Sequence, residues 1–278
     1  MKEEKGILYL IPTPIGNMDD ITKRIVETLR SVDVLFCEDT RSTNILLNYL
    51  GIKKKLISSH KFNEVKNKNK ILNFLQMGLK VGIVSDRGTP VISDPGYILT
   101  KDVIENGYTV IALPGPTAFV PALISSGIIP QPFIFYGFLS SKKSIRIKEL
   151  EKLKYEKYTL IFYEAPHRIE TTIKDLGNIF GDDRKVSISR EITKKYEKTY
   201  YGNLGNIMNF LDEIKGEFVI VVEGNKEIDN LDDIDLIEHI KYYIEKGMPS
   251  MEAIKQVSKE RNMKKSEVYK LYQEEKEK

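Results

Sequence analysis

The 278-residue sequence contains only one cysteine and three histidines. A single cysteine permits no disulfide within the chain and no cysteine-based zinc site. His60, His167 and His239 are far apart and lack metal-ligand spacing, so we expect no structural metal. Cys37 lies in the run DVLFCED, which predicts a buried thiol on a strand.

Long apolar segments are also missing. No stretch approaches the roughly eighteen consecutive apolar residues of a membrane span. The first apolar run, within MKEEKGILYLIPTPIG, is too short for a signal peptide. We therefore expect a cytoplasmic protein without a membrane partner. Hydrophobic residues make up 41% and charged residues 30%, which favours a folded chain with a sizeable core over disorder.

The net charge of +3 is small, but lysines are concentrated in three segments. These segments are Lys53–Lys70, Lys142–Lys157 and Lys255–Lys270. Local basic clusters suit a polyanion such as nucleic acid. An ordinary lysine-rich, solvated surface explains them equally well, and the sequence leaves both interpretations open.

Apolar runs alternate with helical patterns, which predicts an α/β protein of two domains. In residues 1–114 the alternation indicates a parallel sheet with helices on both faces. Residues 115–225 repeat the alternation, and Lys198–Gly202 has the pattern of an antiparallel strand, so we expect a mixed sheet there. Residues 226–278 predict three short helices resembling a helix-turn-helix, with Ser250 as an N-cap.

The turns after the predicted strands lack the usual phosphate-binding loops. No G-x-x-x-x-G-K-[ST] motif occurs, and the prolines of Pro12–Asn17 lack the N–H groups that a pyrophosphate needs. The turn VSDRGTPVISDPGY offers Asp86 and Asp94 but no lysine. Such turns suit a ligand with a cationic group and hydroxyls, such as S-adenosylmethionine. Ordinary βα turns, which favour Gly, Pro and Asp, are the alternative.

Eight motifs occur in an order that resembles a known family. They are LYLIPTPIGNMDDITKR, CEDTR, SSHKFNE, VSDRGTPVISDPGY, LPGPTA, FYEAPHR, SREITKKYE and GEFVIVVEG. Together they resemble the tetrapyrrole methylase superfamily (class III methyltransferases) and, more narrowly, the ribosomal RNA small subunit methyltransferase I family. The resemblance implies a homodimer that binds S-adenosylmethionine between two α/β domains. It also implies methylation of the ribose 2′-hydroxyl of a cytidine in the decoding region of 16S rRNA, within the 30S subunit.

The resemblance also implies site residues. Cofactor contacts are expected at Pro14, Ile15, Ser85, Asp86, Gly88, Thr89, Thr117, Ala118, Phe162, Tyr163, Glu217 and Phe218. The candidates for orienting or deprotonating the 2′-hydroxyl are Glu38, Asp39, His60, Asn63 and Glu64. Arg41, Arg168 and Arg190 are expected to hold phosphates, and Asn17 to contact substrate. For Glu38, Asp39 and Arg41 the alternative is a structural ion pair that caps a helix.

One position departs from the family pattern. Where the family usually has a small residue in S-D-A-G-T-P, this sequence has Arg87. Because an arginine facing a sulfonium is unfavourable, we expect its side chain to point to solvent, to Asp94 or to an RNA phosphate. We expect Asp94-Pro95-Gly96 to cap the next helix.

Two other functions compete with rRNA methylation. One is a sister methyltransferase acting on a corrinoid, a porphyrin or a modified histidine of a translation factor. The other is an RNA-binding protein that has lost catalysis.

Overall fold

The computed structural model describes residues 5–60, 63–226 and 235–276. The chain divides into two compact units, one ending at Gly224 and the other beginning at Asn225. Both β-sheets belong to the first unit. Within the described ranges, no helix is long and apolar enough to cross a membrane.

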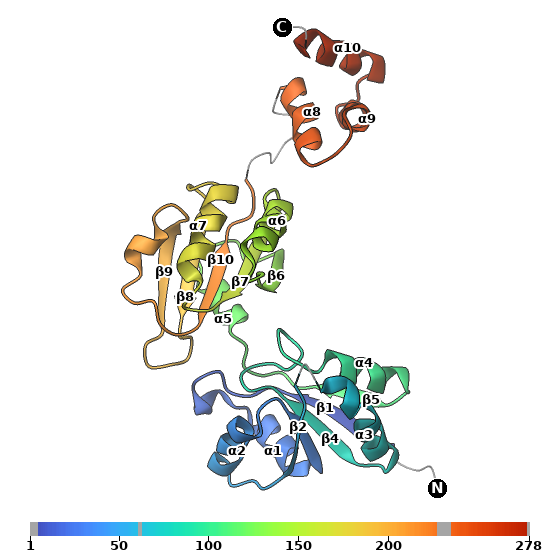
Figure 1. Cartoon of the computed structure of the whole chain (residues 1–278), viewed down its shortest axis with the longest axis vertical. Helices are drawn as coiled ribbons and strands as arrows, with labels where there is room; N and C mark the ends of the chain where they lie inside the picture. Colours follow the sequence, from blue (N-terminus) through green and yellow to red (C-terminus); the bar gives the residue numbers. More distant parts are fainter. Residues whose placement is uncertain (1–4, 61–62, 227–234, 277–278) are drawn as a thin grey trace. The chain divides into compact units, whose positions relative to one another are not determined.

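The N-terminal half of the first unit, residues 5–114, contains a sheet with helices on both sides (Figure 1). Its strand order is β3-β2-β4-β1-β5, and every neighbouring pair is parallel, as expected from the sequence. Cys37, on β2, is buried as predicted. The elements are β1 (Ile7–Ile11), the 3-10 helix η1 (Met18–Asp20), α1 (Lys23–Ser31), β2 (Val34–Cys37), α2 (Thr40–Tyr49), β3 (Lys55–Ser58), α3 (Glu64–Gln76), β4 (Lys80–Val84), α4 (Tyr97–Glu105) and β5 (Thr109–Ala112).

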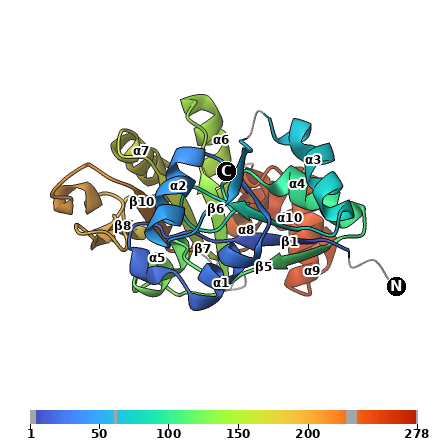
Figure 2. The same cartoon turned by 90° about the horizontal axis from the view of Figure 1, so that it is seen from below.

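Apolar clusters fill the space between this sheet and its helices. On one face, Ile25 and Leu29 of α1 and Leu47 of α2 are buried in one cluster. On the other face, Ile71 of α3 and Leu99 of α4 are buried in a second. Helices α3 and α4 lie side by side (Figures 1 and 2). Each fully buried aliphatic side chain contributes about 1.5–3 kcal/mol, so both helix layers are firmly attached to the strands.

The second half of the first unit, residues 115–224, holds a mixed sheet of order β6-β7-β10-β8-β9. Strands β6 and β7 are parallel, and the other three pairs are antiparallel. The segment Lys198–Gly202 lies in the antiparallel strand β9, as its alternating pattern indicated. The elements are α5 (Phe119–Ile124), β6 (Phe133–Phe138), α6 (Lys143–Leu153), β7 (Thr159–Glu164), α7 (Ile169–Phe180), β8 (Lys185–Arg190), β9 (Lys198–Asn203), the 3-10 helix η2 (Ile207–Phe210) and β10 (Phe218–Val222).

This second sheet also has apolar cores on both faces. Leu150 of α6 and Ile173 of α7 are buried against one face. Leu123 of α5 packs with Val219 and Val221 of β10 on the other. Side chains along a strand alternate between faces, so the residues of β7 and β10 divide between these two cores.

The loop after β1 contacts the second half. Ile15 is buried in the cluster formed by α5 and β10. The Asn17 N–H donates to Thr193 Oγ1 at 3.2 Å. A Cβ on Gly16 would overlap the Lys194 side chain, so glycine permits this close approach. The two halves are thus joined by both apolar and polar contacts.

The second unit contains three helices, α8 (Leu236–Glu245), α9 (Ser250–Glu260) and α10 (Lys265–Lys276). Their small core includes Ile240, Ile254, Val257 and Val268. Helix α9 begins at Ser250 with Pro249 in the N-cap position, and no side chain caps it there. The prediction of Ser250 as the N-cap is therefore wrong by one residue.

Candidate functional site

The loops that follow β1 and β4 are joined by paired backbone hydrogen bonds. The Thr13 N–H donates to the Gly88 carbonyl at 2.9 Å, and the Gly88 N–H donates to the Thr13 carbonyl at 3.0 Å. The buried Ser85 hydroxyl also donates to the Gly88 carbonyl, at 2.8 Å. Gly88 has a φ of 79°, a conformation that favours glycine. These bonds fix the loop at the carboxyl ends of neighbouring strands, where α/β folds bind ligands.

A cavity of about 550 Å³, the first cavity, is lined by this loop and by the second half. Its volume falls in the range of about 300–1,000 Å³ that is typical of small-molecule sites. Many of the predicted cofactor contacts line it. Those before β6 are Ile15, Gly88, Thr89, Thr117 and Ala118. Those from the second sheet are Tyr163, Glu217 and Phe218.

The phenol group of Tyr163, on β7, lies next to the start of α5. Burial raises the pKa of Tyr163, and hydrogen bonds with the Thr117 side chain and with the backbone of Phe119 and Ala118 partly oppose that rise. Thr89 Oγ1 donates to the Pro116 carbonyl at 3.0 Å, which ties the loop after β4 to the segment before α5. Tyr163 is therefore a neutral, fixed polar group in the cavity wall at pH 7.

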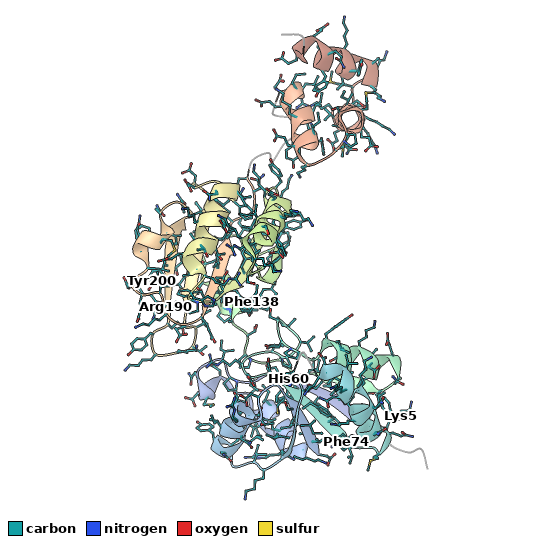
Figure 3. The ribbon with its side chains drawn as sticks, viewed as in Figure 1. Lys5, His60, Phe74, Phe138, Arg190 and Tyr200 are labelled. Atoms are coloured by element: carbon teal, nitrogen blue, oxygen red, sulfur yellow. The ribbon has the colours of Figure 1, made fainter. Side chains whose placement is uncertain are left out.

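Several lining residues were not predicted from the sequence. They include Phe138 at the end of β6 (labelled in Figure 3), Ile192, Val219 and the segment 165–167. The segment 165–167 belongs to the FYEAPHR motif, whose role could not be assigned from the sequence. Val219 could have been found from the alternation of side chains, because it lies two positions after the predicted contact Glu217 and therefore on the same face.

Phe162 is a correction, because its side chain does not reach the cavity. It is fully buried, in the cluster that includes Ile220 and faces α6 and α7. Its neighbours Ile161 and Tyr163 belong to the cluster on the opposite face. Adjacent strand residues point to opposite faces, and the Phe162 side chain points to the face covered by α6 and α7, while Tyr163 lines the cavity. Ser85 likewise does not line the first cavity, because its hydroxyl is used within the loop.

Asp94 lines the first cavity and has no hydrogen-bond or ion-pair partner among the described residues. Burial, together with the charges of Glu38 and Asp86, raises the pKa of Asp94 to about 7. Gly96 occupies the N-cap of α4, but the Asp94 side chain does not cap the helix. The expectation that Asp94-Pro95-Gly96 caps the next helix therefore holds for Gly96 and not for the Asp94 side chain.

Arg87 forms an ion pair that connects the two halves of the first unit. Its Nη1 lies 2.5 Å from Glu217 Oε1. Lys194 Nζ contacts the other Glu217 oxygen at 2.9 Å and Glu191 at 2.8 Å. Of the three expected directions for the Arg87 side chain, Asp94 is not its partner, because Glu217, 130 positions away in the sequence, takes that place. The side chain is 56% exposed, which agrees with the expected direction toward solvent, and it also lines the first cavity.

A second cavity, of about 290 Å³, shares the lining residues Ile15 and Arg87 with the first. Pro14 and Asp86, which were predicted as cofactor contacts, line the second cavity and not the first. Asp86 Oδ1 accepts a hydrogen bond from the Asp39 N–H at 3.1 Å. Asp86 therefore joins the carboxyl end of β4 to that of β2.

The three predicted catalytic residues lie at the start of α2. Asp39 is the N-cap, and its carboxylate accepts the Arg41 N–H at 2.8 Å and the Arg41 guanidinium at 2.7 Å. These hydrogen bonds from Arg41 lower the pKa of Asp39 to about 2. Burial, and next the charge of Asp86, raises the pKa of Glu38. For Asp39 and Arg41 the structure has the helix-capping ion pair that was the alternative, and none of the three lines either cavity.

The described residues of the segment SSHKFNE are joined by local hydrogen bonds after β3. The His60 N–H donates to Asn63 Oδ1 at 2.8 Å, and Asn63 Nδ2 donates to the Ser58 carbonyl at 3.2 Å (His60 is labelled in Figure 3). Lys61 and Phe62 lie outside the described residues. The Asn63 amide is thus used in these local hydrogen bonds, and neither His60 nor Asn63 lines the first or second cavity.

Glu64 is a further correction to the predicted substrate contacts. Its side chain is buried, and Oε1 accepts the N–H groups of Gly96 and Leu99, each at 3.1 Å. These N–H groups lie at the start of α4, where backbone N–H groups have no hydrogen-bond acceptor within the helix. Glu64 therefore caps α4 from the neighbouring helix and does not face a substrate.

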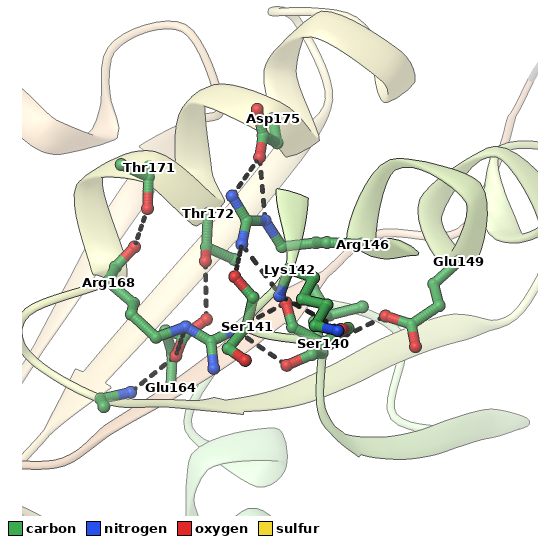
Figure 4. Close-up of polar contacts among 12 residues, drawn as sticks. Ser140, Ser141, Lys142, Arg146, Glu149, Glu164, Arg168, Thr171, Thr172 and Asp175 are labelled. Carbon is green, nitrogen blue, oxygen red and sulfur yellow. Dashed lines mark hydrogen bonds and ion pairs between the residues drawn. The ribbon is translucent and has the colours of Figure 1, made fainter. Parts of the chain in front are cut away.

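Arg168 belongs to a polar network behind the first cavity (Figure 4). Its Nε lies 3.3 Å from Glu164 Oε1, and its Nη2 donates to the Leu139 carbonyl at 2.8 Å. Glu164 Oε2 accepts the Thr172 hydroxyl at 2.6 Å. The guanidinium of Arg168 thus ties the segment after β7 to the residue that follows β6, and its expected contact with a phosphate stays a prediction.

Arg190 and Asn17 also have structural partners. Arg190 is buried, with Nε donating to the Lys215 carbonyl at 2.6 Å and Nη2 to Glu213 at 2.7 Å. Asn17 Oδ1 accepts the Asp19 N–H at 3.0 Å and caps the short helix η1. Neither Arg190 nor Asn17 lines the first or the second cavity, and the expected phosphate contact of Arg190 stays a prediction.

Comparison with protein families gives a match along most of the chain. Residues 7–208 match the family of Tetrapyrrole (Corrin/Porphyrin) Methylases. The chain is 46% identical to the ribosomal RNA small subunit methyltransferase I of Bacillus subtilis (strain 168), covering 98% of this chain and 95% of the relative. It is 43% identical to the protein of that name from Halalkalibacterium halodurans, over 99% and 97% of the two chains. For Streptococcus pyogenes serotype M3 the identity is 39%, over 98% and 96%.

Solved structures with the same fold are much more distant in sequence. The uroporphyrin-III-C-methyltransferase of Thermus thermophilus matches with a TM-score of 0.57 and 15% identity, over 79% of this chain and 94% of the other. The methyltransferase CobJ matches with a TM-score of 0.58 and 16% identity, over 79% and 93%. At this identity the likeness supports the fold alone.

Proposed function

Since the chain belongs to the ribosomal RNA small subunit methyltransferase I family of the tetrapyrrole methylases, we propose that it methylates 16S rRNA with S-adenosylmethionine. The acceptor in this proposal is the ribose 2′-hydroxyl of a cytidine in the decoding region. Near full-length identity of 39–46% to three relatives of that name supports the reaction class.

The observation that carries the proposal is the chemistry of the first cavity. Among the described residues that line it there is no lysine, whereas Asp94, Glu164 and Glu217 are present. A cationic ligand is favoured where carboxylates outnumber cations. Ile15, Phe218 and apolar neighbours supply the wall that a nucleoside ring needs. The residues present therefore fit S-adenosylmethionine.

When bound, S-adenosylmethionine supplies an activated methyl group on a sulfonium. Asp94 is the group suited to the cofactor's positive charge, because its carboxyl has no partner among the described residues. Tyr163 and Thr117 also line the first cavity, and each provides a hydroxyl there. Gly88 keeps the loop backbone close, because a Cβ there would lie 3.2 Å from Ile15 Cγ2. These groups orient the ligand, which accounts for much of the rate of a methyl transfer.

The test combines a binding and a transfer measurement. Isothermal titration with S-adenosylmethionine should give saturable binding. Tritiated-methyl transfer should label 30S subunits from a strain that lacks the enzyme, and nucleoside mapping should find 2′-O-methylcytidine. Absence of cofactor binding would favour an inactive RNA-binding protein. Label on a corrinoid, a porphyrin or a protein, with none on rRNA, would favour a sister methyltransferase.

A further inference from the structure

The two neighbouring cavities differ in the charge of their linings. Of the residues that the structure describes, three carboxylates and one guanidinium are the acidic and basic groups that line the first cavity, beside His167. Those around the second, among the described residues, are Arg87, Lys194 and Asp86. The first cavity therefore favours a cation and the second an anion.

We propose that the second cavity binds one ribonucleotide of the substrate, with its ribose hydroxyl at Asp86 and its phosphate at Lys194 and Arg87. This inference rests on the proposed function, because it needs the methyl donor in the first cavity. Reacting atoms must approach to about 3–3.5 Å. Ile15 and Arg87 line both cavities, so the two cavities are direct neighbours.

Both cations have hydrogen-bonding capacity left for a phosphate. A guanidinium has five N–H donors, and the Arg87 group gives one hydrogen bond, to Glu217, among the described contacts. An ammonium has three, and Lys194 uses two, on Glu191 and Glu217. Glu191 and Glu217 therefore hold the Arg87 and Lys194 side chains at the edge of the second cavity. Each of these cations keeps N–H donors that a phosphate can accept.

Asp86 supplies the acceptor that a ribose hydroxyl needs. Its Oδ1 accepts one hydrogen bond, from the Asp39 N–H. A carboxylate has about four acceptor positions over its two oxygens, so Asp86 can also accept a hydroxyl. A deoxyribose lacks the 2′-hydroxyl, and this contact therefore distinguishes RNA from DNA.

An apolar surface for a base lies on the same cavity. Ile45 of α2 is 65% exposed, and it lines the second cavity with Leu46 and Met18. A ligand that packs against an exposed aliphatic side chain removes apolar surface from water, which favours binding. Ile45 therefore marks where the face of the base would pack.

The first test replaces the apolar surface by a charge in the full-length protein. Ile45→Asp should weaken filter binding of unmodified 30S subunits by about tenfold. Its affinity for S-adenosylmethionine should remain within about twofold of wild type, since Ile45 does not line the first cavity. Ile104→Asp is the matched control, because Ile104 is 57% exposed on α4 and lines neither cavity. Equal 30S affinity for wild type and Ile45→Asp would overturn the proposal.

The second test measures the phosphate contact. Lys194→Met should lower the slope of log affinity against log salt by about 0.7–0.9. Lys101→Met, an exposed residue of α4, should leave that slope unchanged. An unchanged slope for Lys194→Met would contradict a phosphate at this position. If wild type binds 30S subunits but transfers no methyl group, the proposed function fails, while these binding measurements still decide the subsite.

Discussion

Asp94 shows how one side chain links the cavity to the stability of the fold. Its pKa rises from the usual 3.8 to about 7, chiefly through burial. The folded state therefore holds this proton more tightly than the unfolded state does. As a result, the contribution of Asp94 to stability falls as pH rises from about 4 to about 7 and is constant above that.

Asp94→Asn should consequently be more stable than wild type at pH 8 and equal to it at pH 4. Asparagine does not ionise, so the variant avoids the unfavourable buried charge. A gain of about 1 kcal/mol would raise Tm by about 2–4 °C in a chain of this size. Thermal unfolding at the two pH values is the measurement, and identical curves at pH 8 would contradict the assignment.

The same carboxyl group predicts a pH dependence of cofactor binding. A cationic ligand prefers the ionised form of Asp94, so affinity for S-adenosylmethionine should increase as pH rises through about 7. In Asp94→Asn the affinity should be lower at pH 8 and nearly independent of pH. Titration calorimetry between pH 6 and 8 tests this, and parallel pH profiles for both proteins would argue against it.

Two arginine–carboxylate ion pairs should differ strongly in how much they stabilise the folded protein. The Arg87 and Glu217 side chains are 56% and 62% exposed, so Arg87→Ala should cost at most about 1 kcal/mol. Arg146 and Asp175 are each 6% exposed and lie 2.7 Å apart (Figure 4). Arg146→Ala should cost about 3–5 kcal/mol, because it leaves a buried carboxylate without its partner. Urea unfolding of both variants checks this ranking, which similar losses would refute.

Among the elements, α4 depends on a side chain of another helix. Its first turn is capped by Glu64 of α3, which accepts two backbone N–H groups. This contact links the motif SSHKFNE to the turn VSDRGTPVISDPGY, because Glu64 of the first accepts the N–H of Gly96 in the second. A motif that resembles a substrate site can therefore have a structural role.

Glu64→Ala should destabilise the protein by about 1–3 kcal/mol, because two N–H groups lose their acceptor. Glu64→Gln keeps one carbonyl oxygen and should lose less. Val65→Ala is a suitable control, since Val65 is 62% exposed on the same helix. Equilibrium unfolding in urea measures all three, and a loss for Glu64→Ala no larger than that of the control would disprove the capping role.

At the scale of the whole molecule, the division after Gly224 separates the cavities from the three-helix unit. All lining residues of both cavities belong to the first unit. The second unit contains the basic segment Lys255–Lys270, which suits a polyanion.

A chain truncated after Gly224 should therefore keep its affinity for S-adenosylmethionine. Its affinity for 30S subunits should fall, and the salt dependence of that binding should become shallower, because fewer phosphates are contacted. Calorimetry and filter binding at several salt concentrations provide the two measurements. Unchanged RNA affinity would instead assign the helices a role in folding or in dimer formation.

The sequence alone determined the α/β class, the parallel first sheet and the mixed second sheet, and it identified some of the residues around the first cavity. Hydrophobic periodicity and turn chemistry act between near neighbours in the chain; Ile15 and Gly88 follow strands that such patterns identify, and Tyr163 lies near the end of one. The partners of charged side chains depend on which distant elements pack together. Only the tertiary structure could pair Arg87 with Glu217 or place Asp86 and Asp94 in different cavities. Burial and the nearest opposite charge decide these roles, and neither is a local property of the chain.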